Sequence, residues 1–292
     1  MNTPSINQLA ILGVGLIGGS VALALKQAGQ VATVTGAGRD MDTLAEAIRL
    51  DAIDHGATLE EAVSNADVVL LATPVGQFPR IMQAIVPHLK ADAVVTDVGS
   101  TKSDVVATAR SHMGKHLSRF VPAHPIAGAE KSGVAAARAD LFVGKHVVLT
   151  PLPETNPDAI EIVESLWQIC GAKVSQMTPL MHDEVFAAVS HLPHLLAFAL
   201  VAELANRSNP EQLFNYAAGG FRDFTRIAAS SPEMWRDISL ANKGPLLKEL
   251  KAYQDQIAYL AAVLEQGDGI ALQTLFQQAS IARNNWNKNS GN

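Results

Sequence analysis

The chain contains a single cysteine, Cys170, among its 292 residues, so no disulfide can form within it. Cys170 lies on the apolar face of an expected helix, and we interpret it as a packed thiol of a cytoplasmic protein rather than a nucleophile. An excess of basic residues is also lacking, because the formal net charge is −6 at pH 7. The chain therefore offers no broad basic surface for nucleic acid, and a small anionic substrate has to be bound by local cations.

Charged residues are missing from residues 9–25, where an uncharged apolar run could mark a signal peptide or a membrane span. No basic residue precedes this run, no small-residue cleavage site follows it, and a glycine cluster interrupts it. A span would need roughly 20 apolar residues without such a cluster. We therefore predict no membrane partner, and the 48% hydrophobic content suffices for the cores of a soluble, two-domain enzyme.

The glycines in this run predict a dinucleotide-binding turn. Residues 9–12 are apolar and indicate a buried strand, and apolar residues recur at helical spacing after residue 20. Between them lie Gly13, Gly15 and Gly18, in G-x-G-x-x-G spacing. The first glycine permits a tight turn, the second lets a pyrophosphate approach the backbone, and the third lets helix and strand pack closely. The glycine spacing alone is common, but its position between an expected strand and an expected helix favours a dinucleotide-binding turn.

The end of the next expected strand indicates which cofactor is bound. An acid usually stands there to bind the adenosine ribose, about 20 residues past the glycines, and that position falls near Gly38, followed by Arg39. A small residue and a guanidinium suit a ribose phosphate, so NADP is favoured and NAD is the alternative. If the strand ends two residues later, Asp40 is the ribose ligand and the preference reverses. The residues predicted to bind the cofactor are Gly13, Gly15, Leu16, Ile17, Gly18, Arg39, Thr73 and Pro74.

Alternating strands and helices continue through the first part of the chain and then stop. The rhythm predicts an α/β, Rossmann-like, doubly wound domain over residues 1–177 and an all-α domain for substrate binding and dimerisation over residues 178–292. The apolar helix faces of the second part are wide enough to predict a homodimer, whereas its polar tail, residues 283–292, is expected to fray. Strands are expected at 67–72, 93–97, 119–123, 146–150 and 173–177, and helices at 78–89, 101–112, 158–169, 195–204 and 246–264.

Polar residues at the ends of these strands are candidates for the active site, because ligands gather at the carboxyl ends of parallel strands. Thr73 and Pro74 end one strand, Ser100 follows another, and His124 ends a third. Ser100 either caps the helix that begins at Thr101 or contacts the substrate. His124 is either a structural histidine or a proton acceptor beside a nicotinamide.

Two further clusters lie in the helical half. His191 and His194 are three residues apart and share one side of a helical turn, but they lack a partner motif such as His-Glu-x-x-His, so we predict no metal site. Residues 219–228 hold a double glycine with Arg222 and Arg226. Either Asp223 forms a weak surface ion pair with one of these arginines, or the segment closely approaches a carboxylate ligand.

Taken together, these motifs resemble one family, the prephenate and arogenate dehydrogenases of tyrosine biosynthesis. The resemblance implies NAD(P)-dependent oxidative decarboxylation, in which a cyclohexadienyl ring loses hydride and carbon dioxide and becomes aromatic. Prephenate would become 4-hydroxyphenylpyruvate. The chain has no length for a fused mutase or regulatory domain, so any tyrosine feedback is expected to act by competition at the active site. The motifs that carry the resemblance are residues 13–20, 97–102, 124–133, 190–194 and 219–228.

By match to the family's motifs, His124 takes the proton of the substrate hydroxyl, so activity should rise with pH through the histidine range. Ser100 would bond the same hydroxyl or hold His124, and Arg226 would bind a substrate carboxylate. Ala129 replaces a threonine of some members, which leaves prephenate and arogenate both open. A β-hydroxyacid-type dehydrogenase and a non-catalytic NADP-binding module are the alternative functions. The predicted catalytic residues are His124 and Ser100, and the predicted substrate-binding residues are His191, His194, Arg226, Trp235 and Gly219.

Overall fold

The computed structural model describes residues 5–129 and 131–290 of the chain, with side chains up to residue 286. Contacts divide the chain into two compact units, Met1–Lys243 and Gly244–Asn292. The first unit contains the sheets, the helices around them and every residue of the candidate site. The second contains two long helices.

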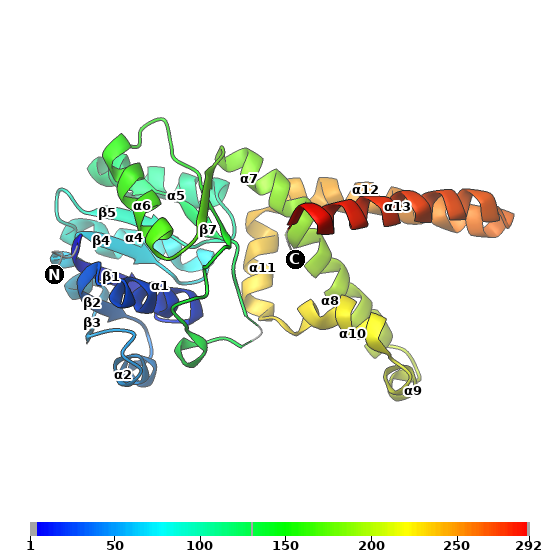
Figure 1. Cartoon of the computed structure of the whole chain (residues 1–292), viewed down its shortest axis with the longest axis horizontal. Helices are drawn as coiled ribbons and strands as arrows, with labels where there is room; N and C mark the ends of the chain where they lie inside the picture. Colours follow the sequence, from blue (N-terminus) through cyan, green and yellow to red (C-terminus); the bar gives the residue numbers. More distant parts are fainter. Residues whose placement is uncertain (1–4, 130, 291–292) are drawn as a thin grey trace. The chain divides into compact units, whose positions relative to one another are not determined.

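A six-stranded parallel sheet forms the centre of the first unit (Figure 1). Its strand order is β3-β2-β1-β4-β5-β6, and every neighbouring pair is parallel. The order reverses between β1 and β4, so the crevice at the carboxyl ends of these two strands is where a Rossmann-like fold binds its ligand. The strands are β1 (Ile6–Leu12), β2 (Val31–Ala37), β3 (His55–Ala57), β4 (Val68–Leu71), β5 (Val94–Asp97) and β6 (Phe120–Val121).

Helices cover both faces of this sheet because alternate residues of each strand face opposite sides. Leu9 and Ile11 of β1 join the core under α1 and α6, while Ala10 and Leu12 join the core under α3, α4 and α5. Cys170 is buried in the first of these cores, and burial raises the pKa of its thiol to about 12, as expected for a packed thiol. The helices are α1 (Leu16–Gln27), α2 (Met41–Arg49), α3 (Leu59–Ser64), α4 (Phe78–Ile85), α5 (Ser103–His112) and α6 (Pro157–Ile169).

A second sheet of three strands corrects one prediction. It comprises β7 (Ala123–Pro125), β8 (His146–Leu149) and β9 (Lys173–Gln176), with β7 antiparallel to β8. The strand predicted at 119–123 divides at Pro122, which cannot donate to a ladder but accepts a hydrogen bond from the amide of Thr150. His124 therefore lies within β7 of the second sheet, and the prediction that it ends a third parallel strand is wrong.

After β9 the described part of the chain is entirely helical, as predicted. Helix α13 continues to Ser290, and the guanidinium of Arg283 lies over the ring of Trp286, 4.5 Å from its centroid. The fraying expected of the tail stays a prediction. Residues 291–292 of that prediction lie outside the described residues. The helices are α7 (Pro179–Phe186), α8 (Leu192–Ala205), α9 (Pro210–Asn215), α10 (Gly219–Thr225), α11 (Pro232–Ala241), α12 (Lys243–Gln266) and α13 (Gly269–Ser290). Short 3₁₀ helices occupy Val75–Gln77, Val86–His88, Gly114–Arg119, Val134–Ala136 and Arg226–Ala229, and a π-helix occupies Ala187–His191.

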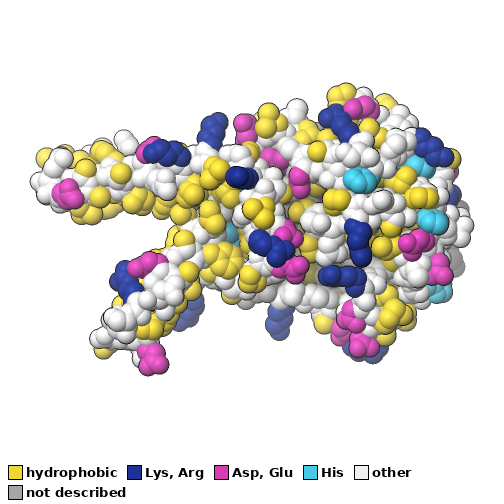
Figure 2. Space-filling model, turned by 180° about the vertical axis from the view of Figure 1, so that it is seen from behind, with side chains coloured by type: hydrophobic (Ala, Val, Ile, Leu, Met, Phe, Trp, Pro, Cys, Tyr) yellow, Lys and Arg dark blue, Asp and Glu magenta, His cyan; other side chains and the backbone are white. Residues whose placement is uncertain are grey.

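The helices after residue 178 carry much apolar surface. The stretch Pro179–Ala205 has a mean hydropathy of 1.9, and only 28% of its apolar window is buried, so by length and composition alone it could cross a membrane. In α8 itself only Leu192 and Ala197 are buried. Figure 2 shows hydrophobic side chains spread over the arm that carries α8, α9 and α10. Exposed apolar surface of this extent is typical of a protein interface.

Candidate active site

The glycine turn between β1 and α1 has the shape of a dinucleotide cradle. Gly13 has a φ of +102°, and a side chain there would meet the carbonyl of Ala72 at 2.8 Å. A side chain at Gly18 would meet the carbonyl oxygen of Gly13 at 2.7 Å, so only glycine lets α1 approach the sheet this closely. Gly15, at the N-cap of α1, instead has open space on its Cβ side and no side-chain cap.

The residues around this turn fit a bound dinucleotide. Uncapped amides at the start of α1, where Leu16 and Ile17 begin the helix, are typical of phosphate binding. Across the crevice, Thr73 and Pro74 follow β4, and the hydroxyl of Thr73 is buried with no hydrogen-bond partner in the described part of the chain. A nicotinamide carboxamide is the kind of group that would satisfy this orphaned hydroxyl.

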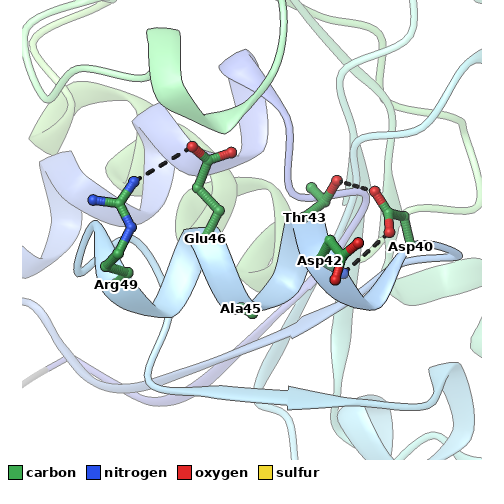
Figure 3. Close-up of a pocket in the computed structure, with 6 residues that line it drawn as sticks. All are labelled: Asp40, Asp42, Thr43, Ala45, Glu46 and Arg49. Carbon is green, nitrogen blue, oxygen red and sulfur yellow. Dashed lines mark hydrogen bonds and ion pairs between the residues drawn. The ribbon is translucent and has the colours of Figure 1, made fainter.

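The ribose end of the cradle lacks a free acid. Strand β2 ends at Ala37, and Gly38 and Arg39 follow it. Asp40 is the N-cap of α2: its carboxylate accepts hydrogen bonds from the amide of Asp42 at 3.0 Å and the hydroxyl of Thr43 at 2.6 Å (Figure 3). These two bonds occupy the carboxylate and lower its pKa, the hydroxyl contributing most. Strand β2 therefore ends too early for Asp40 to be the ribose ligand.

His124 lies at the centre of the site and is held by a chain of side chains from α7. Its ring is nearly buried, at 9% exposure, and its Nδ1 lies 2.8 Å from Nε2 of His182. On the other side of that ring, Nδ1 of His182 lies 2.9 Å from the carboxylate of Asp183. The ring of Phe186 packs edge-on against His124, with 4.9 Å between centroids. Sequence reasoning missed His182 and Asp183, because a His-Asp pair at the start of a helix matches no motif.

Asp183 joins three helices around the site. Its carboxylate accepts hydrogen bonds from the amides of Lys102 and Ser103, both at 2.8 Å, at the start of α5. Its carbonyl oxygen accepts one from the side chain of Asn242, beyond α11, at 2.8 Å. Helix α5 begins at Ser103 and its N-cap is Lys102. Ser100 is therefore not the cap of a helix beginning at Thr101, and Asp183 satisfies these first amides from 80 residues away.

A buried ion pair fixes the loop that carries Ser100. The ammonium of Lys102 lies 2.5 Å from the carboxylate of Asp97 at the end of β5, and both side chains are fully buried. The same carboxylate accepts hydrogen bonds from the amides of Gly99 and Ala123. Breaking such a pair leaves an uncompensated buried charge, so the loop after β5 and the start of β7 are held together. Ser100 and His124 are thereby positioned by one carboxylate.

The predicted pair His191 and His194 meets Trp235 of α11. The ring of His194 stacks on the indole, with 3.7 Å between centroids and 19° between planes, and the ring of His191 lies edge-on at 6.0 Å. Asn242 lies 2.9 Å from Nδ1 of His191. The indole nitrogen of Trp235 is buried without a hydrogen-bond partner among the residues described. An orphaned buried nitrogen of this kind indicates a site for a polar ligand.

A π-helical turn places these histidines. Residues Ala187–His191 form it directly before α8, and Pro193 in the first turn of α8 cannot donate the amide hydrogen bond that would continue a regular helix. Such π turns are frequent at functional sites. His191 ends the turn and is buried, whereas His194 is half-buried.

Arg226 lies close to these histidines, whereas Gly219 lies at the exposed start of α10. Arg226 begins the 3₁₀ helix after α10, and this 3₁₀ helix packs on α8. Burial lowers the pKa of His194, and the charge of Arg226 adds to that effect. Gly219 begins α10, is exposed, and has open space around it. The structure thus brings together His124, His191, His194 and Trp235 with the charge of Arg226, whereas Gly219 lies at the exposed start of α10.

The imidazoles of the site are neutral at pH 7. Burial lowers the pKa of His124 well below its usual range, and the neighbouring His182, Lys102 and His191 act in the same direction. Burial also lowers the pKa of His191 to about 4, although the charge of Asp183 and the main chain of Ser100 oppose the change. A neutral imidazole has a free nitrogen lone pair and can accept a proton. The arrangement can therefore carry general-base chemistry beside a dinucleotide.

Comparison with known proteins agrees with this geometry. Residues 21–176 match the family "Prephenate dehydrogenase, nucleotide-binding domain", and residues 178–278 match "Prephenate dehydrogenase, dimerization domain". The chain is 35% identical over 278 residues to the cyclohexadienyl dehydrogenase of Zymomonas mobilis, with 94% of each chain covered. It is 37% identical to the prephenate dehydrogenase of Bacillus subtilis, covering 94% of this chain and 75% of that protein.

Solved structures are similar as well. The structure of Aquifex aeolicus prephenate dehydrogenase in complex with hydroxyphenyl propionate and NAD+ has a TM-score of 0.90 and 38% identity, covering 97% of this chain and 99% of that one. Synechocystis arogenate dehydrogenase has a TM-score of 0.80 and 29% identity, covering 96% and 99%. These matches confirm the fold class, a Rossmann-like domain followed by a helical dimerization domain, and the identification as an NAD(P)-dependent oxidoreductase. The chain belongs to the prephenate dehydrogenase family.

Proposed function

We propose that the protein catalyses the NAD(P)-dependent oxidative decarboxylation of prephenate to 4-hydroxyphenylpyruvate, or of arogenate to tyrosine. The observation that carries this proposal is the buried, neutral ring of His124, held by two side chains from α7 and close to the loop that carries Ser100. The nicotinamide, when bound, supplies the hydride acceptor. The ring carboxylate leaves as carbon dioxide, and aromatisation of the ring makes the reaction favourable.

The residues of the chain have separate tasks in this proposal. His124 takes the proton of the substrate hydroxyl as the carbonyl forms, and Ser100 bonds the same hydroxyl. Arg226 binds a substrate carboxylate through its guanidinium. His191, His194 and Trp235 wall the substrate in this proposal, and the role of Gly219 stays a prediction from the family resemblance. The orphaned indole nitrogen of Trp235 is available to a polar group of the substrate.

A two-by-two assay tests the proposal. Pure protein is incubated with prephenate or arogenate and with NAD or NADP, and the absorbance of reduced cofactor is followed. We expect cofactor reduction in at least one of the four combinations, with an aromatic product of matching amount. No reduction in any of them, with dinucleotide binding intact, would instead favour the non-catalytic module. A β-hydroxyacid-type dehydrogenase should carry a catalytic lysine on a glycine-rich helix after the domain boundary, whereas residues 190–194 offer histidines instead.

The pH dependence of this activity should differ from that of an ordinary histidine. His124 must be neutral to act, and burial lowers its pKa in the free protein. The dependence of kcat/KM on pH reports the free enzyme, so the rise with pH should be complete below pH 6.5, and the plateau should extend through neutrality. The expectation of a rise through the whole histidine range is corrected accordingly. A half-maximal kcat/KM at or above pH 6.5 would contradict the buried, neutral ring.

NADP is the cofactor that we propose as preferred. The support is Gly38 at the end of β2, the neighbouring Arg39, and the engagement of Asp40 with its own helix. Replacing Arg39 with alanine should weaken NADP binding by on the order of tenfold or more, the scale of a charge-assisted hydrogen bond. NAD binding should stay unchanged. Isothermal titration of both cofactors measures the difference.

A second arginine provides the control for this experiment. Arg49 lies at the far end of α2, exposed and 3.5 Å from Glu46 (Figure 3). Replacing Arg49 with alanine removes the same charge from the other end of α2, whereas Arg39 precedes the N-cap of this helix, and it should change neither affinity. If Arg39→Ala weakened NAD and NADP equally, Arg39 would not distinguish the ribose phosphate.

We further propose that the protein is a cytoplasmic homodimer whose domains meet at residues 177/178. The family match names a dimerization domain from residue 178, and the exposed apolar helices from Pro179 onward are surfaces that a second copy would bury. The proposal predicts the mass of two chains in solution by light scattering. A single-chain mass at micromolar concentration would contradict it.

A further inference from the structure

We propose that His182 and Asp183 are positioning residues that hold His124 in one tautomer, with the proton on Nδ1 and the free lone pair on Nε2. The proposal rests on the proposed function, because it explains how His124 is prepared to accept a proton. Neither residue contacts the substrate in this scheme. They act through His124, from helix α7, which the sequence motifs do not include.

The direction of the hydrogen bonds that link Asp183, His182 and His124 is set at Asp183. Its carboxylate accepts hydrogen bonds from the amides of Lys102 and Ser103 at the start of α5, where the helix dipole favours negative charge. Burial alone would raise the pKa of Asp183, but the hydrogen bonds from His182, Ser103 and Lys102 outweigh it, and the pKa is lowered. An ionised carboxylate only accepts hydrogen bonds. The proton between Asp183 and His182 therefore belongs to His182.

The remaining protons follow from this one. His182 donates from Nδ1 to Asp183 across 2.9 Å. Burial lowers the pKa of His182, so the ring is neutral and its Nε2 can only accept. The 2.8 Å contact with His124 then requires Nδ1 of His124 to be the donor. A neutral imidazole carries one ring proton, so Nε2 of His124 is the free base.

The surroundings keep this arrangement fixed. The side chains of His182 and Asp183 are almost fully buried, at 0% and 3% exposure. Asn242 holds the carbonyl oxygen of Asp183, and Phe186 packs against both imidazoles. The charged groups near His124 are the paired Lys102 and Asp97 together with Asp183, and the titratable ones are His182 and His191. Rotation of either ring would leave a buried nitrogen unpaired, which disfavours the rotated state.

Two substitutions at His182 separate hydrogen bonding from packing. In His182→Gln, the amide can donate to Asp183 and its oxygen can accept from Nδ1 of His124. In His182→Met, the side chain fills similar space but offers no comparable acceptor. We expect His182→Gln to retain most of the wild-type kcat, and His182→Met to lose about tenfold or more, part of the contribution of a general base. KM and cofactor affinity should change little in either variant.

The tautomer itself can be read on the protein without substrate. ¹⁵N NMR of histidine-labelled protein distinguishes a protonated ring nitrogen from a free one, and the signals of His124 are assigned by their absence from His124→Asn. We expect Nδ1 of His124 to be protonated in the wild type and in His182→Gln. In His182→Met and in Asp183→Ala the proton should move to Nε2 or exchange between both nitrogens. His112→Gln, a histidine in α5 that bonds the carbonyl of Thr108 in its own helix, is the matched control.

The outcomes distinguish this proposal from the proposed function. A tautomer in His182→Met that equals the wild type overturns it, as does an equal loss of kcat in His182→Gln and His182→Met. If Asp183→Ala fails to fold because the first amides of α5 lose their acceptor, the comparison of His182→Gln with His182→Met still tests the proposal. If no substrate is turned over at all, the proposed function fails, whereas the NMR measurement still tests the tautomer.

Discussion

Replacing His124 with asparagine should reduce turnover by roughly 10² or more and leave cofactor binding intact. The side chain of asparagine occupies part of the ring's volume and can still hydrogen-bond to His182, but its amide cannot accept a proton near neutral pH. The cofactor cradle is formed by the turn after β1, and His124 lies in β7 of the second sheet, so the substitution leaves the cradle unchanged. Steady-state kinetics and cofactor titration measure the two quantities separately.

The control is His112→Asn, which makes the same substitution in α5, away from the residues of the site. It should keep wild-type turnover. If His124→Asn turned over prephenate and arogenate as fast as the wild type, the proton acceptor would be another group. If it lost turnover and cofactor binding together, the effect would be one of folding rather than of chemistry. Thermal melting of both variants distinguishes these cases.

The sequence was sufficient to predict the parts of the site that lie in local motifs. The glycine turn after β1 is such a part, because spacing and apolar periodicity describe it completely. His191 and His194 were placed on one side of a helical turn by their spacing alone, and they do share the indole of Trp235. The roles assigned to Ser100, Arg226 and Gly219 came from the family resemblance and stay predictions.

What could not be predicted depends on contacts between distant segments. Asp183 satisfies amides about 80 residues away in α5, and no local pattern marks a helix whose cap comes from another helix. The second sheet is a similar case. Apolar residues on both sides of Pro122 form one continuous run, and only the pairing of Ala123 with Leu149 of β8 shows that the chain changes sheets there. The role of His124 stays a prediction, and its expected place in the fold was wrong.

Acidification should destabilise the folded protein between pH 6.5 and pH 4. The folded pKa of His191 is about 4, below the ordinary value of about 6.5 in an unfolded chain. Between these values the unfolded chain binds a proton that the folded chain does not, so the free energy of unfolding falls as pH falls. The side chain is almost fully buried, at 1% exposure, and the difference corresponds to about 3 kcal/mol for this residue alone. Burial lowers the pKa of His124 and His182 as well, in the same direction.

Urea unfolding at a series of pH values measures this loss. Asp54, Asp67 and Asp183 have lowered pKa values, so their stabilising contributions persist above the unfolded value near 3.9 and are lost only below it. Burial raises the pKa of Asp97, which acts in the opposite direction as pH falls, so a comparison with a His191 variant isolates the histidine contribution. Replacing His191 with glutamine removes this group and should make the decline from pH 6.5 to pH 4 shallower by about 3 kcal/mol. An equal decline in the wild type and in His191→Gln would show that His191 titrates normally and would contradict its lowered pKa.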